Sequence, residues 1–499
     1  MGRRMQRSRR IVDHLTMRAV LLVLLASGCG GGSNTAQGPP QPPPSQPPSE
    51  SPLRASIWLT TEDEEIRLRC EEPVEFTSDS AGGADAITIT VDDTIRYQVM
   101  TGFGAAMTDS AAWLIGTRMN DEQRGDLLRA LFDPQEGIGL SYLRHTMGSA
   151  DFSLLSYTYN DLPEGETDPD LSEFSIEYDR EYILPVLREV LAINPDVRVM
   201  GTPWSAPAWM KTSNSLIGGS LRPDAYDVYA RYFVRFILAF AAEGVPIESI
   251  TPQNEPLHEA SGYPSMLMSA AEQVEFIKNH LGPALVNAGL TTEIFIYDHN
   301  WDVPGYPMEV LNDLEARAYV AGTAFHCYAG DPDAQTLVHD AHPDKSIMIT
   351  ECTGLVTPAF GPDLIWAMQN LFIGGARSWA TGVLLWNLAL DENSGPQNGG
   401  CSICRGVVTV DQETGEVTYN PEYYALGHAS IAARPGAYRI ESSEIPGLAS
   451  SVAFLNPDGS KGLLVLNPLQ EPLTVNVIWN DQSFLYTLPA EAVATFTWP

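Results

Sequence analysis

Basic residues are scarce in this chain of 499 residues. Lysine and arginine together number 29 against 63 aspartates and glutamates, which gives a formal net charge of −34. Because nucleic acids and anionic lipid headgroups are themselves negative, they are poor partners for a body with this charge. A neutral substrate such as a sugar is compatible with it.

Cysteines and long apolar runs are scarce as well. Six cysteines in 499 residues are too few for a scaffold that depends on a dense set of disulfides. The apolar stretch at residues 19–26 is too short to span a bilayer stably. Apolar residues nevertheless make up 44% of the chain, which is ample for a large core and a smaller second domain.

Residues 1–29 have the composition of a secretion signal. Six arginines precede or adjoin the apolar stretch, and the small residues Ser27 and Gly28 follow it. The ending LLASGC resembles the bacterial lipoprotein signal, in which cleavage leaves a lipidated cysteine, here Cys29, as the first residue. We therefore expect an exported protein of the cell envelope whose only membrane contact is a lipid on Cys29. Ordinary cleavage without a lipid is the alternative.

The rest of the chain divides by its hydrophobic pattern. Residues 30–52 are rich in Pro, Ser and Gly, which predicts a semi-extended spacer. Residues 53–96 and 434–499 alternate apolar and polar positions between Gly and Asp turns, which is typical of strands. We expect these two ends to form one side β-domain, a β-sandwich, with a structural role.

The middle of the chain, residues 97–433, alternates strand-like runs with helical periodicity. Eight such βα units over roughly 340 residues predict an α/β fold, the (β/α)8 or TIM barrel. A doubly wound sheet is the alternative, but TGFGAAM at residues 101–107 lacks the third glycine of a dinucleotide-binding loop. The strand-like runs are residues 95–104, 137–144, 197–204, 248–254, 293–300, 322–328, 346–351 and 381–387.

Two glutamates stand at the ends of predicted strands. Glu255 is followed by Pro256, which prevents the strand from continuing, and Glu351 ends the run SIMITE. Because barrel active sites form at the carboxyl ends of the strands, the two carboxylates are expected to face one cleft. Hydrolysis of a glycosidic bond needs such a pair, one as proton donor and one as nucleophile or base.

Seven motifs resemble, in the same order, those of the glycoside hydrolase family 30 enzymes, and most of all the glucosylceramidase-like branch. The resemblance covers the chain from about residue 95 to the C-terminus. It implies a (β/α)8 barrel, a side β-domain built from both chain ends and a retaining mechanism; we expect no cofactor and no metal. The motifs are GFGAAMTDSAA, LRHTMGSADFS, TPWSAPAWMK, TPQNEP, HCYAGDP, TECTG and WNLALDENSGP.

By this resemblance Glu255 is the general acid/base and Glu351 the nucleophile. Glu255 must then be protonated near neutral pH to donate to the leaving oxygen, and Glu351 must stay ionised to attack the anomeric carbon. A retaining mechanism predicts carboxyl groups about 5–5.5 Å apart, whereas roughly 6.5–9.5 Å would indicate inversion.

Four residues are expected to hold the sugar. The amide of Asn254 is suited to the 2-hydroxyl, and Asp151 resembles the family carboxylate that takes sugar hydroxyls. Trp204 and Trp386 end predicted strands, where a flat apolar ring can stack on a pyranose.

Three further residues are expected beside the carboxylates. Arg144 is predicted to pair with a catalytic carboxylate and keep it ionised, with a purely structural ion pair as the alternative. His326 and Tyr328 flank the cleft, and Tyr328 resembles the residue that hydrogen-bonds the nucleophile.

Four cysteines lie in or near these motifs. Cys401 and Cys404 form a single CxxC, which is weak evidence for a metal, and a local disulfide is favoured over free thiols in an exported protein. Cys327, between His326 and Tyr328, is expected to change a wall of the substrate site. Cys352 is expected to be packed and unreactive.

These observations predict an exported retaining β-glycosidase acting on β-glucosyl linkages, glucosylceramidase-like. An endo-β-1,6-glucanase or related β-glycanase of the same family is the alternative. A different class of protein, a catalytically silent lipoprotein that binds carbohydrate, would differ in failing to hydrolyse a chromogenic β-glucoside.

Overall fold

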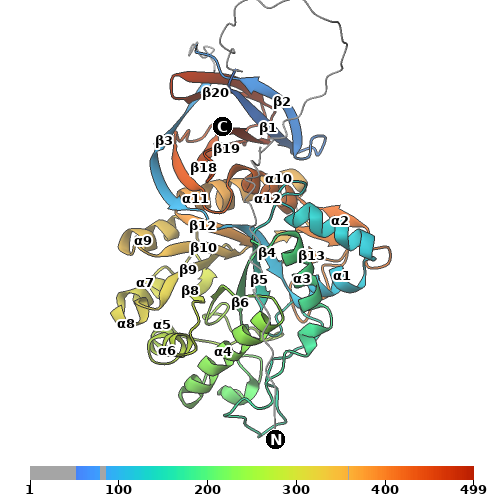
Figure 1. Ribbon diagram of the computed structural model, residues 1–499, viewed down its shortest axis with the longest axis vertical. Helices are drawn as coiled ribbons and strands as arrows, with labels where there is room; N and C mark the ends of the chain where they lie inside the picture. Colours follow the sequence, from blue (N-terminus) through green and yellow to red (C-terminus); the bar gives the residue numbers. More distant parts are fainter. Residues whose placement is uncertain (1–51, 79–85, 358) are drawn as a thin grey trace, which may run out of the picture. The chain divides into compact units, whose positions relative to one another are not determined.

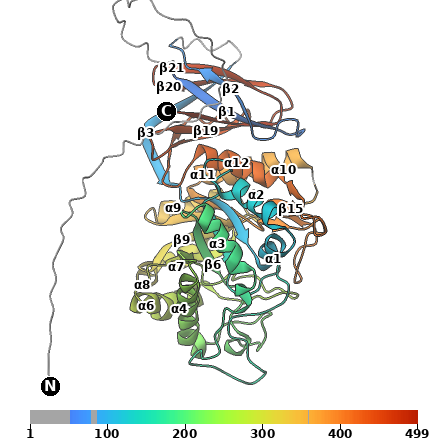
Figure 2. The same cartoon turned by 45° about the vertical axis from the view of Figure 1, so that its right-hand side comes forward.

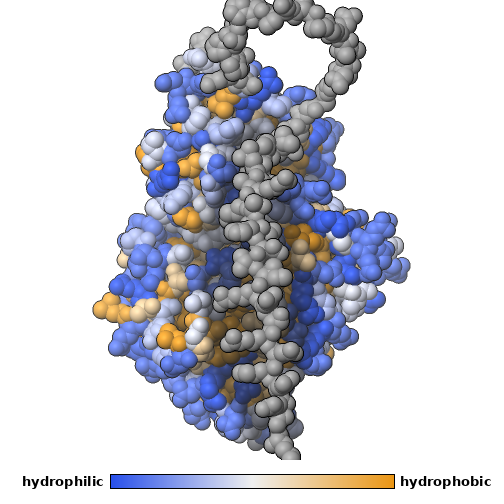
Figure 3. Space-filling view, viewed as in Figure 1, coloured by the Kyte–Doolittle hydropathy of each residue, from blue (hydrophilic) through white to orange (hydrophobic). Residues whose placement is uncertain are grey.

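The computed structural model describes residues 52–78, 86–357 and 359–499 (Figure 1). The expected secretion signal with Cys29, and all of the expected spacer except residue 52, lie outside the described residues. Within these described ranges, none of the helices combines the length and the apolarity that crossing a bilayer requires. The face drawn in Figure 3 is mainly hydrophilic, with apolar side chains in scattered patches.

In the described part of the chain, eight parallel strands close into a barrel in the order β10-β12-β4-β5-β6-β7-β8-β9. This confirms the predicted (β/α)8 fold. Six apolar side chains on these strands, among them Tyr142, Phe295 and Met348, form a cluster separate from the one shared with the helices, so they fill the barrel interior. The strands are β4 (Gly102–Met107), β5 (Tyr142–Thr146), β6 (Arg198–Thr202), β7 (Ser249–Ile250), β8 (Glu293–Asn300), β9 (Val320–His326), β10 (Ser346–Glu351) and β12 (Ala380–Leu385).

Helices surround the barrel (Figure 1). The longest, α4, buries Tyr229, Phe233, Phe236 and Phe240, whose spacing of three and four residues places them along one face. The helices are α1 (Asp109–Thr117), α2 (Asp121–Phe132), α3 (Ile183–Ile193), α4 (Tyr226–Ala242), α5 (Ala270–Phe276), α6 (Gly282–Asn287), α7 (Gly305–Asn312), α8 (Leu314–Arg317), α9 (Asp333–Ala341), α10 (Phe360–Ala367), α11 (Gly374–Arg377) and α12 (Pro421–Ala432).

The helical segment over residues 270–287 is divided into two α-helices. Ser269 and Glu272 form a capping box at the start of α5, as expected for a helix beginning there. A π-helical turn at Ile277–Leu281 then separates α5 from α6. Pro283 accounts for the break, because its ring lacks an N–H and displaces the preceding turn.

The two ends of the described chain interleave in one nine-stranded sheet, in the order β2-β1-β22-β19-β18-β17-β3-β20-β21. This confirms a side β-domain built from both ends. Its own core contains Phe76, Phe484, Phe496 and Trp498. The strands are β1 (Arg54–Thr61), β2 (Arg69–Glu75), β3 (Ile87–Val99), β17 (Tyr438–Ser442), β18 (Ser450–Leu455), β19 (Lys461–Asn467), β20 (Leu473–Trp479), β21 (Gln482–Leu488) and β22 (Ala492–Trp498).

The run at residues 95–104 belongs to two strands and not to one. β3 continues to Val99, which pairs with Tyr438 of β17, so the predicted start of the barrel at residue 97 lies inside the β-domain. The chain turns at Gly102, where φ is +138° and an added Cβ would lie 2.2 Å from Oγ of Ser141. Only glycine fits this close approach, and the barrel begins there.

Helix α12 joins the two domains (Figure 2). The ring of His428 on α12 lies 2.8 Å from Oγ1 of Thr495 on β22 through Nδ1 and 2.8 Å from Oγ1 of Thr60 on β1 through Nε2. Short strands continue the chain beyond the barrel ends and shape the loops beside the site. They are β11 (Gly354–Leu355), β13 (Ala389–Leu390), β14 (Cys404–Arg405), β15 (Val408–Val410) and β16 (Val417–Tyr419).

Candidate active site

Glu255 follows β7 and Glu351 ends β10, and the barrel brings their carboxylates together. One oxygen of each glutamate and a ring nitrogen of His326 all lie within 4.8 Å of one another. Residues far apart in sequence thus meet at the carboxyl ends of the strands, as the pattern of strand-end polar residues predicted.

Glu351 is held by two donors. Nη1 of Arg144 lies 2.6 Å from its Oε2, and the Tyr328 hydroxyl donates to its Oε1 at 3.0 Å. Both contacts were predicted. Burial raises the pKa of Glu351 above its usual value, although the positive charges of His326 and Arg144 oppose this shift.

Asp298 on β8 accepts hydrogen bonds from four residues of the site, and no role was predicted for it from the sequence. It accepts from Nη2 of Arg144 at 2.9 Å, from the hydroxyls of Thr251 and Thr350 at 2.7 Å each, and from Nε2 of His326 at 3.0 Å. Although burial acts to raise it, the pKa of Asp298 lies well below its usual value because of the Arg144 charge and the His326 hydrogen bond. A carboxylate inside the apolar run EIFIYDHN was the available signal.

His326 lies between three carboxylates. Its Nε2 faces Asp298, while its Nδ1 lies 3.2 Å from Oε1 of Glu255 and 3.9 Å from Oε1 of Glu351. Burial opposes the charged form, but the charges of Glu351, Asp298 and Glu255 raise the pKa of His326 to about 9. The imidazolium therefore donates from both nitrogens at neutral pH.

The arrangement of Glu255, His326 and Glu351 is the single group of ligand atoms with metal-like spacing in the described part of the chain. A protonated His326 that donates through both nitrogens has no lone pair left for a metal ion. A metal ion could therefore bind here only by displacing a proton from His326.

Glu255 is held in an unusual backbone conformation. Its φ is +44°, in the left-handed region that a non-glycine residue adopts at a cost, and its N–H donates to the backbone oxygen of Asp298 at 2.9 Å. Burial raises the pKa of its carboxyl, but the hydrogen bond from His326 and the charges of His326 and His299 lower it overall. In the substrate-free site the two pKa shifts are thus the reverse of those expected for an acid at Glu255 and a nucleophile at Glu351.

The two tryptophans are not free platforms. The Trp204 and Trp386 rings stack on each other, with centroids 5.0 Å apart and planes inclined by 21°. The guanidinium of Arg144 lies 4.9 Å and 5.4 Å from their centroids, and each side chain is 3% exposed. The ring faces are thus occupied by the other tryptophan and by Arg144, which both rings contact through cation–π interactions. The two tryptophans therefore form a packed wall of the site.

Asp151 and Asn254 lie where a substrate hydroxyl could reach them. Oδ1 of Asp151 is buried without a hydrogen-bond partner, and burial, together with the charges of Glu351 and Glu255, raises its pKa well above the usual value. Oδ1 of Asn254 accepts from Nη2 of Arg144 at 2.6 Å, which orients the amide. A buried carboxyl oxygen without a protein partner is available to a substrate hydroxyl or to a water.

Two disulfides lie beside the site within the described residues. Cys401–Cys404 is present as predicted. Cys352 is packed, as expected, but it is bonded to Cys327, and this pairing was missed. The signal was that each cysteine adjoins a strand-end residue on neighbouring strands, β9 and β10.

Comparison with known protein families identifies both domains. Residues 100–432 match the glycosyl hydrolase family 30 TIM-barrel domain, and residues 436–496 match the glycosyl hydrolase family 30 beta sandwich domain.

Individual relatives are similar over most of their length. An endo-1,6-β-D-glucanase of Aspergillus fumigatus is 36% identical over 447 residues, covering 84% of this chain and 89% of the relative. A lysosomal acid glucosylceramidase of Mus musculus is 31% identical over 436 residues, 83% of each chain. The solved structure of the endo-β1,6-glucanase BT3312 superposes with a TM-score of 0.82 at 33% identity, covering 89% of this chain and 99% of that one. This chain belongs to glycoside hydrolase family 30.

Proposed function

We propose that this protein is a retaining endo-β-1,6-glucanase. The observation that carries the mechanism is the glutamate pair, in which one oxygen of each carboxylate lies within 4.8 Å of the other. This is closer to the spacing of about 5–5.5 Å in a retaining enzyme than to the roughly 6.5–9.5 Å of an inverting one. The linkage is supported by the similarity to two endo-β-1,6-glucanases, at 36% and 33% identity.

The reaction would proceed in two displacements. An oxygen of Glu351 attacks the anomeric carbon while the bond to the leaving oxygen breaks, and that oxygen takes a proton from Glu255. Glu255 then removes a proton from water, whose oxygen attacks the same carbon and releases Glu351. The Arg144 contact at 2.6 Å favours the ionised nucleophile that the first step needs.

His326 would supply the first proton. In the substrate-free site, the cations Arg144 and His326 face three carboxylates, those of Asp298, Glu255 and Glu351. Because Nδ1 of His326 lies 3.2 Å from Oε1 of Glu255, its proton can pass to Glu255 when the leaving oxygen approaches. This transfer reconciles the low pKa of Glu255 in the free site with its role as the acid.

Polar groups that the fold positions near the two glutamates would hold the sugar. The unpartnered oxygen of Asp151 would accept from ring hydroxyls, and the Asn254 amide, oriented by Arg144, would contact the 2-hydroxyl. Trp204 and Trp386 would bound the site as a packed wall.

Glucosylceramide cleavage is the second candidate. It was the first expectation from the sequence motifs, and the 31% identity to the mouse lysosomal glucosylceramidase supports it. The β-1,6-glucanase relatives match this chain at higher identity, so they favour the glucan.

A substrate panel tests the proposal. The protein is incubated separately with linear β-1,6-glucan, β-1,3-glucan and glucosylceramide, and new reducing ends and product lengths are measured. We expect short oligosaccharides from the β-1,6-glucan, with the β-anomer appearing first by NMR. If glucosylceramide is the preferred substrate, the second candidate is favoured. If the α-anomer appears first, a retaining mechanism is excluded. If no substrate is hydrolysed, the protein is a carbohydrate-binding protein and not an enzyme.

Two variants and a control assign the pair. Glu255→Gln and Glu351→Gln should each lower kcat/KM on the glucan, by at least about 10²-fold for the acid. Glu122→Gln, on the exposed face of α2, should keep full activity.

We also propose export with a lipid on Cys29; a tagged fatty acid that fails to label the mature protein would exclude the anchor.

A further inference from the structure

The Cys327–Cys352 disulfide joins the ends of two barrel strands at the reacting centre. Cys327 follows His326, the last residue of β9, and directly precedes Tyr328. Cys352 directly follows Glu351, the last residue of β10. One covalent bond therefore lies beside three side chains of the site.

The backbone alone does not fix this part of the barrel. The pairing of β10 with β9 is regular from Ser346 to Ile349, but its register shifts before Glu351, which pairs with His326. Such an irregularity interrupts the ladder of hydrogen bonds at the point where the nucleophile is placed. The disulfide bridges the two strands one residue beyond it.

The groups that the disulfide joins also depend on one another. The Tyr328 hydroxyl donates to Oε1 of Glu351 at 3.0 Å, and Nδ1 of His326 lies 3.9 Å from the same oxygen. If the strand ends separated, both distances would lengthen together. A misplacement of about 1 Å at a reacting group can lower a rate by on the order of 10²-fold.

We propose that Cys327 and Cys352 are positioning residues whose disulfide holds Glu351, Tyr328 and His326 in the reactive arrangement, so that reducing it lowers turnover. This inference rests on the proposed glycosidase function. Each cysteine acts through the neighbour to which it is joined in the chain.

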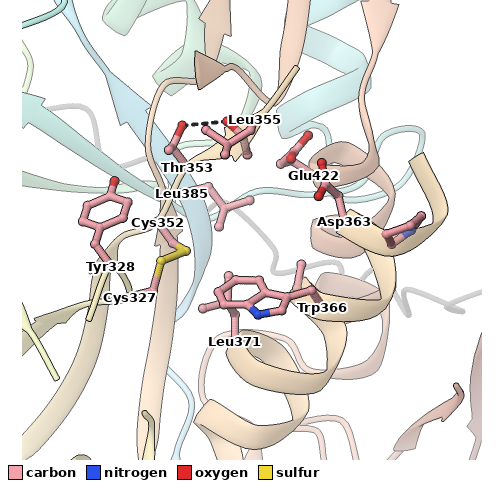
Figure 4. Close-up of a pocket in the computed structure, with 13 residues that line it drawn as sticks. Cys327, Tyr328, Cys352, Thr353, Leu355, Asp363, Trp366, Leu371, Leu385 and Glu422 are labelled. Atoms are coloured by element: carbon pink, nitrogen blue, oxygen red, sulfur yellow. Dashed lines mark hydrogen bonds between the residues drawn. A yellow bond between two sulfur atoms is a disulfide. The ribbon is translucent and has the colours of Figure 1, made fainter. Parts of the chain in front are cut away.

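The bond is accessible from a cavity beside the site. Both cysteines line a cavity of about 460 Å³ whose other walls include Leu355, Trp366 and Leu371. In Figure 4 the disulfide lies between Tyr328 and this apolar space. Cys327 is itself partly exposed, whereas Cys352 is buried, so a small dithiol is expected to attack the disulfide at Cys327.

The chemistry of reduction is a two-electron exchange with an added dithiol such as dithiothreitol. One thiolate of the reagent attacks a sulfur, breaks the S–S bond and forms a mixed disulfide; its second thiolate closes the reagent into a ring. Cys327 and Cys352 become free thiols with the two protons that the thiols of the reagent have lost, and the reagent is oxidised.

The test compares three proteins with and without dithiothreitol. For the wild type on β-1,6-glucan we expect kcat to fall by roughly tenfold to a hundredfold on reduction, with KM within about twofold, and reoxidation should restore it. Cys327→Ala/Cys352→Ala should begin at the lowered kcat and not respond further. Cys401→Ala/Cys404→Ala removes the other disulfide and should keep the response to reductant.

A second readout does not depend on turnover. In protein with ¹⁵N-labelled histidine, the His326 signal, assigned with His326→Gln, should titrate near pH 9 while the disulfide is intact. After reduction it should titrate at lower pH, because the charge of Glu351, the largest contribution that raises this pKa, has moved away. A purely structural disulfide elsewhere in the fold would not produce this shift.

The outcomes separate the two proposals. Unchanged kcat and an unchanged His326 titration, once mass spectrometry shows Cys327 and Cys352 reduced, would overturn the positioning role. An oxidised wild type that hydrolyses no β-glucoside would overturn the proposed function instead, and the His326 titration would still decide the positioning role. If the double alanine variant does not fold, reduction of the wild type gives the same comparison.

Discussion

Nη1 of Arg144 lies 2.6 Å from Oε2 of Glu351, and the arginine is fully buried. Its other terminal nitrogen is shared between Asp298 at 2.9 Å and Asn254 at 2.6 Å. The planar guanidinium thus joins residues from three strand ends through fixed directions, which a lysine cannot reproduce. Arg144 is therefore the residue on which the electrostatic balance of the site depends.

Replacing Arg144 tests this dependence. Arg144→Lys should lower kcat/KM on β-glucan by at least about 10²-fold, because the bidentate geometry is lost. Arg144→Met leaves Asp298 and Glu351 buried without their cation and should destabilise the fold by about 3–5 kcal/mol. Steady-state kinetics and urea unfolding measure the two effects.

Arg188 provides the matched control. It pairs with Glu243 at 3.0 Å, but its side chain is 45% exposed. Arg188→Met should change stability by no more than about 0.5 kcal/mol and leave kcat/KM unaltered. Equal losses in the two arginine variants would mean that the burial of Arg144 is not what matters.

Removing each glutamate in turn separates their roles. With an aryl β-glucoside, whose leaving group needs no proton, Glu255→Ala should still form the glycosyl-enzyme, and added azide should attack it to give the β-azide. Glu351→Ala has no nucleophile, so azide entering its space should attack from the opposite face and give the α-azide. NMR of the products measures the configuration, and interchanged anomers would reverse the two assignments.

The sequence predicted the position of the pair but not the support around it. Pro256 ends the strand before it can continue past Glu255, and this local signal is visible in the chain itself. The signal for Asp298, a carboxylate in an apolar run, is ambiguous, because such a carboxylate can be solvated or buried, and only the packing of Arg144 and His326 decides which.

Side-chain packing also explains the other differences. Trp204 and Trp386 were expected to present open ring faces, but their distance and tilt depend on rotamers that no periodicity encodes. The Cys327–Cys352 bond follows from the adjacency of β9 and β10, which the barrel order supplies once the strands are numbered. Strand count and chain-end pairing, in contrast, follow from patterns repeated over many residues, and they were predicted.

Because of the raised pKa of His326, we expect the free energy of unfolding to decrease as the pH rises above 6.5. Its folded value is about 9, above the ordinary value of 6.5, so the folded protein binds the proton more tightly than the unfolded chain does. The resulting stabilisation is complete below pH 6.5 and is lost as the pH rises through 9, a loss of about 3 kcal/mol. Urea unfolding at pH 6.5 and 9.5 measures it.

The variant His326→Gln isolates this contribution. It cannot titrate, so the difference in unfolding free energy between the two pH values should shrink by that amount. If wild type and variant lose equal stability between pH 6.5 and 9.5, other groups cause the loss and the buried imidazolium is refuted.

Because of the lowered pKa of His428, we expect the free energy of unfolding to decrease as the pH falls below 6.5. It is buried between α12 and the β-domain, and burial lowers its pKa from 6.5 to about 3. Here the unfolded chain binds the proton more tightly, so stability is lost as the pH falls below 6.5, by about 2 kcal/mol between pH 6.5 and 4.5. Its hydrogen bonds with Thr60 and Thr495 place the effect at the joint between the domains.

His428→Gln should reduce this acid-side loss, and His280→Gln, where the ring pairs with an exposed aspartate, should not. Unfolding curves at pH 4.5 and 6.5 give both comparisons. Because His326 destabilises above pH 6.5 and His428 below it, the wild type should be most stable near that pH and each glutamine variant should flatten one side only. A wild-type curve that keeps rising from pH 6.5 to 9.5 would contradict the assignment of the two histidines to opposite sides.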